Sequence, residues 1–391
     1  MVERDKDEDI ELSARMVEWA PPGGDATILP AMERCLGHNL RGVLATVIAV
    51  EGSAYRRPGA KMVVTPSGTV GGAITAGCLE GEVRALAADV LDAGQLRVET
   101  YDLTTDDTWG LGIGCNGIVD ILLEPLTDVF TPVVDALATN DSLAIGTVID
   151  GPASVRGEKW FYRGDTGDRT ELPDWVTTDH IAAAETAIAT GVSRVDRSHS
   201  EITVFVDGIS PRPDLVIVGS GNDITPLIDV ATAASMQPRV VGFRGARTTT
   251  ERFPGAASVS STSPASIDHS IPIGACTYVV LMSHNIVDDQ VALGRLLRTR
   301  TPYIGLMGPR DRFDEIRTRL ARDGGRPVDS PEYDRVYAPV GLDIGGESPS
   351  EIAISIVSEI LACHYNRPAN HLCDKTGPIH ERPEVTSPAN R

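Results

Sequence analysis

The segment that decides the fold is PDLVIVGSGNDI, residues 213–224. Its apolar run Leu215–Val218 has the length and composition of a buried strand, and Gly219 and Gly221 follow it directly. A strand, a glycine-rich turn and a helix in this order open a βαβ unit and are the usual context of a dinucleotide-binding loop. The segment therefore predicts a parallel, Rossmann-like sheet that begins near residue 213.

Downstream of this segment, short apolar runs alternate with helix-like stretches, which indicates a doubly wound parallel sheet. The last helix is well marked, because Ser348 is a suitable N-cap and Glu351 stands three residues later. We expect this Rossmann-like C-terminal domain to span residues 213–365, and a disordered tail rich in Pro, His and charge to span 366–391. The expected strands are 214–218, 239–243, 277–283, 302–306 and 335–338.

Upstream, the pattern predicts an N-terminal mixed α/β domain with its connecting region at residues 27–212, preceded by an acidic segment at 1–26. Residues 151–174 are polar and have the composition of a loop. The chain is thus expected to combine two α/β domains. In the first, we expect strands at 42–50, 62–65, 68–74, 119–123, 142–149 and 202–206, and helices at 28–38, 79–93 and 180–190.

The chain is strongly acidic, with a formal net charge of −20 over 391 residues. Such a surface repels phosphates, which argues against general nucleic-acid binding, and it is typical of proteins that must stay hydrated at high salt. The six cysteines form no CxxC pair, so we interpret them as free thiols of a reducing compartment. The N-terminus has no apolar signal core and no apolar run could cross a bilayer, so we expect a cytoplasmic protein.

A basic loop bounded by glycines follows the first expected strand: GSAYRRPGAKM, residues 52–62. Its Arg56 and Arg57 suit a phosphate or a carboxylate, because clustered arginines beside a glycine loop offer bidentate donors. The alternative is a loop whose arginines pair with the many surface acids. Composition favours neither of these two interpretations.

Two cysteines lie in glycine-rich segments of the N-terminal domain, GGAITAGCLEGE (71–82) and WGLGIGCNG (109–117). Cys78 follows Gly77 at the start of an expected helix, where the helix dipole favours a thiolate that could act as a nucleophile or soft metal ligand. The alternatives are an inert buried thiol at Cys78 and a tight Asn-Gly turn after Cys115. Two such segments in one domain make a shared site more plausible than either alone.

The glycine turn at Gly219 and Gly221 departs from the dinucleotide fingerprint. Ile224 takes the place of the third glycine, and Asp223 puts negative charge where a pyrophosphate would sit. No acid ends the next strand, where Arg244 could meet a 2′-phosphate instead. Ordinary NAD(P) binding is therefore disfavoured.

Polar loops at the carboxyl ends of the later strands are where such folds bind ligands. Residues 288–289 are interpreted as a helix start. The remaining candidates for cofactor contacts in these loops are His284, Arg310, Arg312 and Asp343.

In seven ordered segments, from about residue 40 to about 362, the chain resembles the xanthine dehydrogenase accessory factor family, also called the XdhC/CoxI family. It differs from the family pattern at Gly242, Asn285 and Pro309. The matching segments are GSAYRRPGAKMVV (52–64), GGAITAGCLEGEV (71–83), GLGIGCNGIVDILLEP (110–125), ERFP (251–254), MSHNIVDD (282–289), YIGLMGPRDR (303–312) and APVGLDIGGESPSEIAISIVSEI (338–360).

The resemblance implies a factor that binds the molybdenum cofactor (molybdopterin), supports its sulfuration by a cysteine desulfurase, and inserts it into a molybdenum hydroxylase such as xanthine dehydrogenase or carbon monoxide dehydrogenase. Cys78 matches by position the family's cysteine linked to the cofactor, and is the expected contact to molybdenum. Cys115 is the next candidate, while Arg56 and Arg57 would meet the phosphate or a protein carboxylate. We expect a homodimeric cofactor chaperone rather than a turnover enzyme.

Two other functions stay open at this point. The strand and turn around Gly219 and Gly221 are compatible with an NAD(P)-dependent oxidoreductase. A non-enzymatic docking module for a molybdenum hydroxylase or a desulfurase would also share the family's segments without holding a cofactor.

Overall fold

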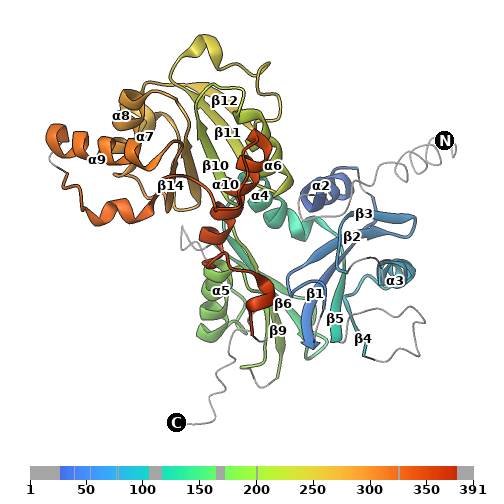
Figure 1. Cartoon of the computed structure of the whole chain (residues 1–391). Helices are drawn as coiled ribbons and strands as arrows, with labels where there is room; N and C mark the ends of the chain where they lie inside the picture. Colours follow the sequence, from blue (N-terminus) through green and yellow to red (C-terminus); the bar gives the residue numbers. More distant parts are fainter. Residues whose placement is uncertain are drawn as a thin grey trace. The chain divides into compact units, whose positions relative to one another are not determined.

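The computed structural model of the chain (Figure 1) divides into two compact units, Met1–Pro211 and Arg212–Arg391, called unit 1 and unit 2. Each unit has its own sheets and hydrophobic cores. The residues that the structure describes are 27–38, 40–52, 54–75, 77, 79–104, 117–163, 172–199, 201–324 and 326–376.

The described part of unit 1 contains two antiparallel sheets, with strand orders β3-β2-β1-β5-β4 and β7-β6-β9-β8. The strands are β1 (Val43–Gly52), β2 (Lys61–Thr65), β3 (Gly68–Gly72), β4 (Arg97–Asp102), β5 (Gly117–Pro125), β6 (Leu143–Asp150), β7 (Lys159–Tyr162), β8 (Arg194–Asp196) and β9 (Thr203–Ile209). The helices are α2 (Ile28–Gly37), α3 (Glu80–Ala93), α4 (Thr131–Thr139) and α5 (Thr178–Thr190), with a 3-10 turn at Asp128–Phe130.

Alternation of side chains along the strands gives unit 1 its layers. On β1, Leu44 and Ile48 pack towards the second sheet, whereas Val43, Ala45 and Val47 pack in the core beneath α3. Strand β9 alternates in the same way between the first sheet and α5. The two sheets therefore share one interior, and α3 and α5 cover their outer faces.

The prediction of a loop over 151–174 is wrong for four residues, because Lys159–Tyr162 forms β7. The strand is short and sits in a polar run, so no periodicity marks it in the sequence. Trp160 is buried, and its indole fills the space where Gly146 on the neighbouring strand has no side chain. Strands β4 and β8 were likewise without a sequence signal.

Unit 2 is built on a six-stranded sheet whose strands pair in parallel in the order β12-β11-β10-β13-β14-β15. Numbered from the first strand of the unit, this is the Rossmann order 3-2-1-4-5-6. The prediction of a Rossmann-like, doubly wound domain is confirmed. The strands are β10 (Asp214–Val218), β11 (Gln237–Gly242), β12 (Ser258–Ser261), β13 (Thr277–Leu281), β14 (Tyr303–Leu306) and β15 (Val336–Tyr337).

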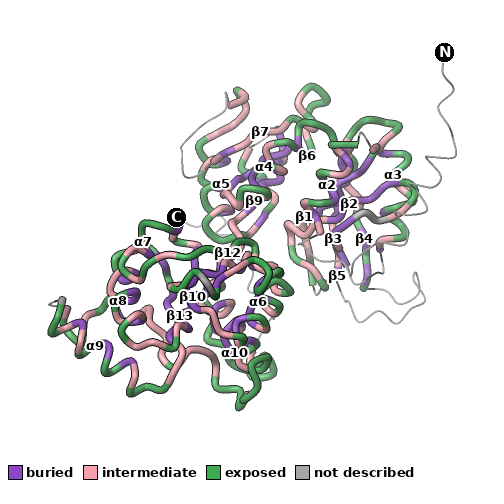
Figure 2. The backbone as a smooth tube through the Cα atoms, turned by 90° about the horizontal axis from the view of Figure 1, so that it is seen from above, coloured by how far each residue is buried: buried purple, intermediate pink, exposed green. Residues whose placement is uncertain are grey.

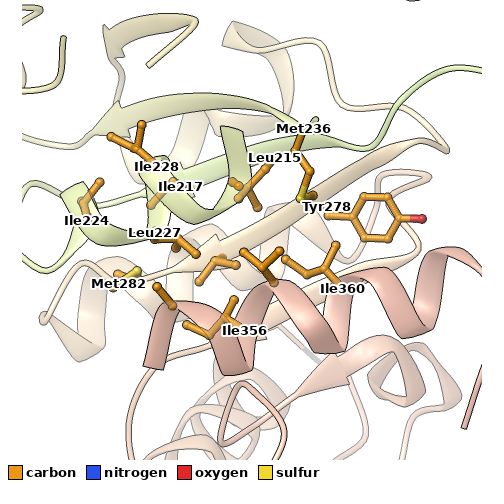
Figure 3. Packing of buried hydrophobic residues seen from close by; sticks show 14 of the residues in the cluster. Leu215, Ile217, Ile224, Leu227, Ile228, Met236, Tyr278, Met282, Ile356 and Ile360 are labelled. Atoms are coloured by element: carbon orange, nitrogen blue, oxygen red, sulfur yellow. The ribbon is translucent and has the colours of Figure 1, made fainter. Parts of the chain in front are cut away.

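Helices cover both faces of this sheet. One face packs against α6 (Ile224–Ala233) and α10 (Pro349–His364), whose side chains interlock with those of β10 and β13 (Figure 3). The other packs against α7 (Ile267–Ser270), α8 (Ile286–Leu296) and α9 (Arg310–Gly324). The strands β10, β13 and β14 are consequently buried along almost their whole length, and Figure 2 colours the tube near the β10 and β13 labels purple, for buried. Short 3-10 turns lie at Gly245–Arg247, Pro264–Ser266, Pro331–Arg335 and Leu372–Asp374.

The predicted start of the last helix is confirmed in atomic detail. The Ser348 hydroxyl accepts from the Glu351 amide, and the Glu351 carboxylate accepts from the Ser348 amide at 2.9 Å. At the other end of α10, His364 Nδ1 lies 3.0 Å from the hydroxyl of Tyr278, at the beginning of β13. Helix α10 therefore begins towards the carboxyl edge of the sheet.

In the part of the chain that the structure describes, no helix combines the length and apolar character needed to cross a membrane.

Candidate functional site

The carboxyl edge of the unit 2 sheet brings four loops together. The amide of Gly219 donates to Val241 at 2.9 Å, that of Met282 to Val218 at 2.7 Å, and that of Met307 to Leu281 at 3.0 Å. The carboxyl ends of β10, β11, β13 and β14 therefore lie side by side along this edge of the sheet. In a doubly wound sheet this edge, at the point where the strand order reverses, is the usual ligand site.

The glycine turn after β10 is shaped by close backbone packing and by one carboxylate. A Cβ on Gly219 would lie 2.6 Å from the carbonyl oxygen of Met282, so only glycine fits there. A Cβ on Gly221 would overlap the Asp223 carboxylate and lie 3.5 Å from His284 Nε2. The carboxylate of Asp223 therefore covers the turn, where a dinucleotide fold would place a pyrophosphate.

His284 faces this carboxylate from the loop after β13. Its backbone is left-handed, with φ +59°, which is unusual for a residue other than glycine. Its Nε2 lies 3.3 Å from Asp223 Oδ2, and its side chain is 62% exposed. The structure thus brings Gly219, Gly221 and His284 into one site, with Asp223 placed to orient the imidazole.

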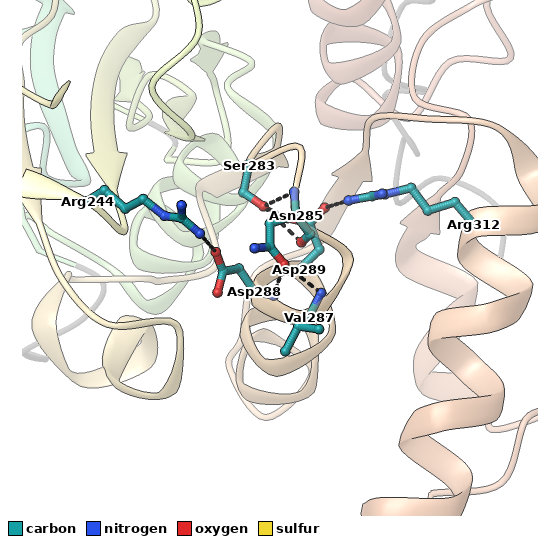
Figure 4. Close-up of polar contacts among 7 residues, drawn as sticks. All are labelled: Arg244, Ser283, Asn285, Val287, Asp288, Asp289 and Arg312. Atoms are coloured by element: carbon teal, nitrogen blue, oxygen red, sulfur yellow. Dashed lines mark hydrogen bonds and ion pairs between the residues drawn. The ribbon is translucent and has the colours of Figure 1, made fainter.

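The first turn of α8 fixes this loop from below (Figure 4). Asn285 is the N-cap, because its Oδ1 accepts from the amides of Val287 and Asp288 at 2.9 and 3.2 Å. The Ser283 hydroxyl accepts from the Asn285 amide at 3.1 Å and donates to Asp289 at 2.5 Å. The left-handed His284 is therefore held by hydrogen bonds on both sides.

Arg312 lies at the same edge but is engaged within the protein. Its Nη2 lies 2.6 Å from Asp289 Oδ2, and the Asp289 carboxylate is almost fully buried. Arg310 is exposed at the start of α9. Asp343 is exposed in a segment that runs along α10, between Leu342, whose carbonyl accepts from the Ser355 hydroxyl at 2.6 Å, and residue 346.

In unit 1, the two cysteines that the sequence predicts as site residues, Cys78 and Cys115, lie outside the described residues. The residues beside Cys78 form a bonded frame. The Glu80 carboxylate accepts from the amide and hydroxyl of Thr75, at 3.2 and 2.6 Å, and from the amide of Leu79 at 3.2 Å. Gly77 is exposed, has φ +110°, and has open space where a side chain would be.

The predicted arginine loop of unit 1 closes at Gly59, which has φ +95°. The Gly59 amide donates to Val47 at 2.8 Å, and the Ala60 amide donates to Arg57 at 3.1 Å. Arg56 is half-buried and Arg57 is exposed. The loop is thus tied to β1, and it connects β1 to β2, two inner strands of the first sheet.

A buried ion pair secures the end of this loop. Lys61 Nζ donates to the Gly59 carbonyl at 2.9 Å and lies 2.6 Å from Asp207 Oδ2. Ser193 donates to the other oxygen of Asp207 at 2.6 Å. The side chains of Lys61 and Asp207 are only 13% and 4% exposed, so this pair joins β2 of the first sheet to β9 of the second through the interior.

A second buried ion pair, Lys159 with Glu124, also joins the two sheets, from β7 to β5. Lys159 donates in addition to the Thr147 hydroxyl at 3.2 Å. Both ion pairs border one small cavity between the sheets. Two of the four lysines of the chain are thus buried in this interior. In the sequence, these two buried ion pairs are indicated by nothing more than the scarcity of lysine.

Among the described residues, no three His, Cys, Asp or Glu side chains form a group that could hold a metal ion. What the carboxyl edge of unit 2 can do is bind and orient a ligand through Asp223, His284 and the glycine turn. In the described part of unit 1, Met62 at the end of the arginine loop pairs with Gly72, so the loop and the residues that follow β3 leave the sheet at the same end.

Comparison with known proteins relates both units to one family. A family model described as the XdhC Rossmann domain matches residues 215–360, and one described as the XdhC and CoxI family matches residues 35–102. A crystal structure described as a xanthine dehydrogenase from Bacillus halodurans aligns with a TM-score of 0.71 and 28% identity, covering 88% of this chain and 97% of that one.

Two curated relatives extend the match. The uncharacterized protein YqeB of Escherichia coli K12 is 26% identical over 178 residues, which are 45% of this chain and 32% of that protein. A protein of Bacillus subtilis 168 described as a probable subunit of xanthine dehydrogenase is 30% identical over 323 residues, which are 82% of this chain and 92% of that protein. With this similarity running through both units, the chain belongs to the XdhC and CoxI family.

Proposed function

We propose that this chain is an accessory factor in the maturation of a molybdenum hydroxylase, such as xanthine dehydrogenase or carbon monoxide dehydrogenase. The observation that carries the proposal is the family relationship along nearly the whole chain, to relatives described as xanthine dehydrogenase components. In this role the protein holds the molybdenum cofactor, supports its sulfuration and passes it to the apoenzyme.

The residues of unit 1 fit the chemistry of molybdopterin. This cofactor supplies a dithiolene-bound molybdenum centre and carries a phosphate. Cys78, with Cys115, is assigned to the metal–sulfur end, because a thiolate is a soft ligand. Arg56 and Arg57 are assigned to the phosphate, in a loop held in shape by Lys61 and Gly59.

The frame beside Cys78 supports this assignment. Hydrogen bonds join Thr75, three residues before the cysteine, to Leu79 and Glu80, which follow it, so these described neighbours are held together. Gly77 leaves room for a close approach. The Glu80 carboxylate, two residues after Cys78 in the sequence, would disfavour a thiolate there, and its three accepted hydrogen bonds reduce that effect.

An oxidoreductase that uses NAD(P) is the less favoured alternative. Its pyrophosphate would meet the Asp223 carboxylate over the glycine turn, and both groups carry negative charge. A docking module that holds no cofactor is the third reading. We propose a cytoplasmic homodimer, with a cysteine desulfurase and the hydroxylase apoenzyme as partners.

The test is retention of molybdopterin by the purified full-length chain. The chain is mixed with isolated molybdopterin and separated by gel filtration, and the protein peak is assayed for molybdenum and for pterin fluorescence after oxidation. We expect both signals to elute with the protein. Elution of all pterin at the position of the free cofactor would contradict the proposal, and a pull-down of the hydroxylase in that case would favour the docking module.

A further inference from the structure

An arginine-rich loop follows β11 at the carboxyl edge of unit 2. This loop, residues 244–252, carries the exposed arginines Arg244, Arg247 and Arg252. The Arg247 amide donates to the Arg244 carbonyl at 3.1 Å, and Arg252 Nη1 donates to the Arg247 carbonyl at 2.8 Å. Hydrogen bonds within the loop therefore hold its backbone, and the loop exposes three arginine side chains.

One of these cations lies at the glycine turn. Arg252 Nη2 donates to Asn222 Oδ1 at 2.9 Å, and its guanidinium lies over the ring of the buried Phe253, 5.3 Å from the centroid. The loop after β11 is thus connected through side chains to the loop after β10. A ligand bound at the glycine turn would lie within reach of these arginines.

The side chain of Arg244 is accessible to a ligand. Its side chain is 68% exposed, and its ion pair with Asp288 spans 3.3 Å (Figure 4). An exposed pair at this distance is weak, because water screens it. A doubly charged phosphate would compete well with Asp288 for the guanidinium, since it accepts bidentate, charge-assisted hydrogen bonds.

The end of β11 has no room for the acidic residue that binds the ribose of NAD in related sheets. In NAD-binding sheets, an acid at the end of this strand binds the ribose diol, whereas arginine there accommodates a phosphate. Here the strand ends at Gly242, and the Thr248 hydroxyl occupies the space that any side chain at 242 would need. An acid is sterically excluded, and Arg244 follows two residues later.

The glycine turn sets a second condition on the ligand. Because the Asp223 carboxylate covers the turn, a pyrophosphate there would be repelled, whereas hydrogen-bond donors would be attracted. His284, which faces Asp223, would line the same position. The ligand that satisfies both conditions has a single phosphate group beside the arginine loop and an uncharged, donor-bearing part over the turn.

We propose that the carboxyl edge of unit 2 is a binding site for a phosphomonoester carried on a small polar organic molecule, with Arg244 and Arg252 on the phosphate and Asp223 on the carrier. The loop's own Glu251 and the neighbouring Asp288 moderate its positive charge without cancelling it. This site lies in unit 2 and does not depend on the cofactor role proposed for unit 1.

The test is calorimetric titration of the full-length chain with AMP, ribose 5-phosphate, inorganic phosphate and NAD⁺. AMP and ribose 5-phosphate, both phosphomonoesters, are expected to bind, and NAD⁺, which has a pyrophosphate and no monoester, to bind at least about tenfold more weakly. Tighter binding of AMP than of ribose 5-phosphate would assign the carrier to nucleosides, and equal binding to a smaller polyol. NAD⁺ binding as tightly as AMP would overturn the proposal.

Variants separate the site from general charge effects. Arg244→Gln and Arg252→Gln are each expected to weaken AMP binding about tenfold, the effect of losing one charge-assisted hydrogen bond. Arg322→Gln is the matched control, because Arg322 is also exposed and pairs with one carboxylate, Asp323 at 2.8 Å, near the far end of α9. Equal losses in all three variants, or none in the first two, would overturn the assignment.

A gain of binding gives the sharpest discrimination. Asp223→Asn removes the negative charge over the glycine turn while keeping the size of the side chain. We expect this variant to bind NAD⁺ more tightly than the wild type does, with urea unfolding used to confirm that it is folded. An unchanged NAD⁺ affinity would contradict the role given to Asp223.

Discussion

Arg312 and Asp289 form an ion pair 2.6 Å long in which the carboxylate is 1% exposed and the arginine side chain 20% exposed. The pair joins the first turn of α9 to that of α8, below the loop that carries His284. A Cβ on Gly308 would lie 2.7 Å from Arg312 Cδ, so position 308, in the turn between β14 and α9, must be glycine for the arginine side chain to keep this path to its partner.

Arg312→Met should destabilise unit 2, because among the described residues it leaves the buried Asp289 carboxylate with the Ser283 hydroxyl as its remaining side-chain partner. We expect the free energy of unfolding, measured in urea, to fall by about 3–5 kcal/mol. Arg319→Met is the control, since Arg319 pairs with Glu315 on the surface of α9 and should lose under about 1 kcal/mol. Equal losses would show that the burial of Asp289 contributes nothing.

The two ion pairs inside unit 1 allow a matched comparison. Asp207→Asn and Glu124→Gln each leave a buried lysine without its counter-charge, and each should lower the free energy of unfolding by about 3 kcal/mol or more. Only Lys61, the partner of Asp207, also holds Gly59 of the arginine loop. Hydrogen exchange at the Ala60 amide should therefore accelerate more in Asp207→Asn than in Glu124→Gln.

Replacing both members of one pair should behave differently. Lys159→Met combined with Glu124→Leu removes the charges together, so the double variant should be more stable than Glu124→Gln alone. A double variant that is less stable than the single one would mean that the ion pair stabilises unit 1 beyond the cost of burying it.

Stability should also depend on pH through His180. This side chain is fully buried, and burial lowers its pKa, because the charged form is desolvated; Asp196 acts in the opposite direction. The unfolded chain then takes up a proton at His180 as pH falls below about 6.5, while in the folded chain this imidazole stays neutral to a lower pH. The free energy of unfolding should therefore fall between pH 7.5 and pH 5.5.

His180→Gln isolates this contribution. Glutamine at this position preserves the capping box with Thr177, since it too can accept from the Thr177 amide. The variant should show a smaller loss of stability on acidification, measured by urea unfolding at the two pH values. Some pH dependence should remain, because burial also lowers the pKa of His364. An unchanged slope would exclude His180 as a source.

Cys78→Ala tests the cofactor assignment. We expect the variant to retain at least about tenfold less molybdopterin than the wild type in the gel-filtration assay, because a metal–thiolate contact is lost. Cys373→Ala is the control, since Cys373 is an exposed thiol of unit 2. Equal retention by all three proteins would remove Cys78 from the cofactor site.

Much of the fold could be predicted where the signal is local. The run Leu215–Val218 with its glycines, and the capping box of Ser348 and Glu351, are each complete within one short segment. Strand β12, with the sequence SVSS, could not be predicted, because three serines carry no apolar alternation. It is a strand because it pairs with β11 along the edge of the sheet.

The candidate site shows the same division. The position of His284 after a buried strand indicates the carboxyl edge, and the structure places it there. The contact between its imidazole and Asp223 could not be predicted. This contact depends on the left-handed backbone at His284 and on the close approach of Gly219 to Met282. Neither feature leaves a pattern in a single sequence, because each is decided by packing between distant segments.

The two buried ion pairs that join the sheets of unit 1 have a consequence for folding. Each sheet contributes one cation and one anion, Lys61 and Glu124 from the first, Lys159 and Asp207 from the second. If the second sheet docked the other way round, lysine would meet lysine and carboxylate would meet carboxylate in a dry interior, at a large electrostatic cost. Apolar contacts alone would discriminate less between the two docking orientations. These four charged side chains therefore favour the observed orientation of the second sheet on the first.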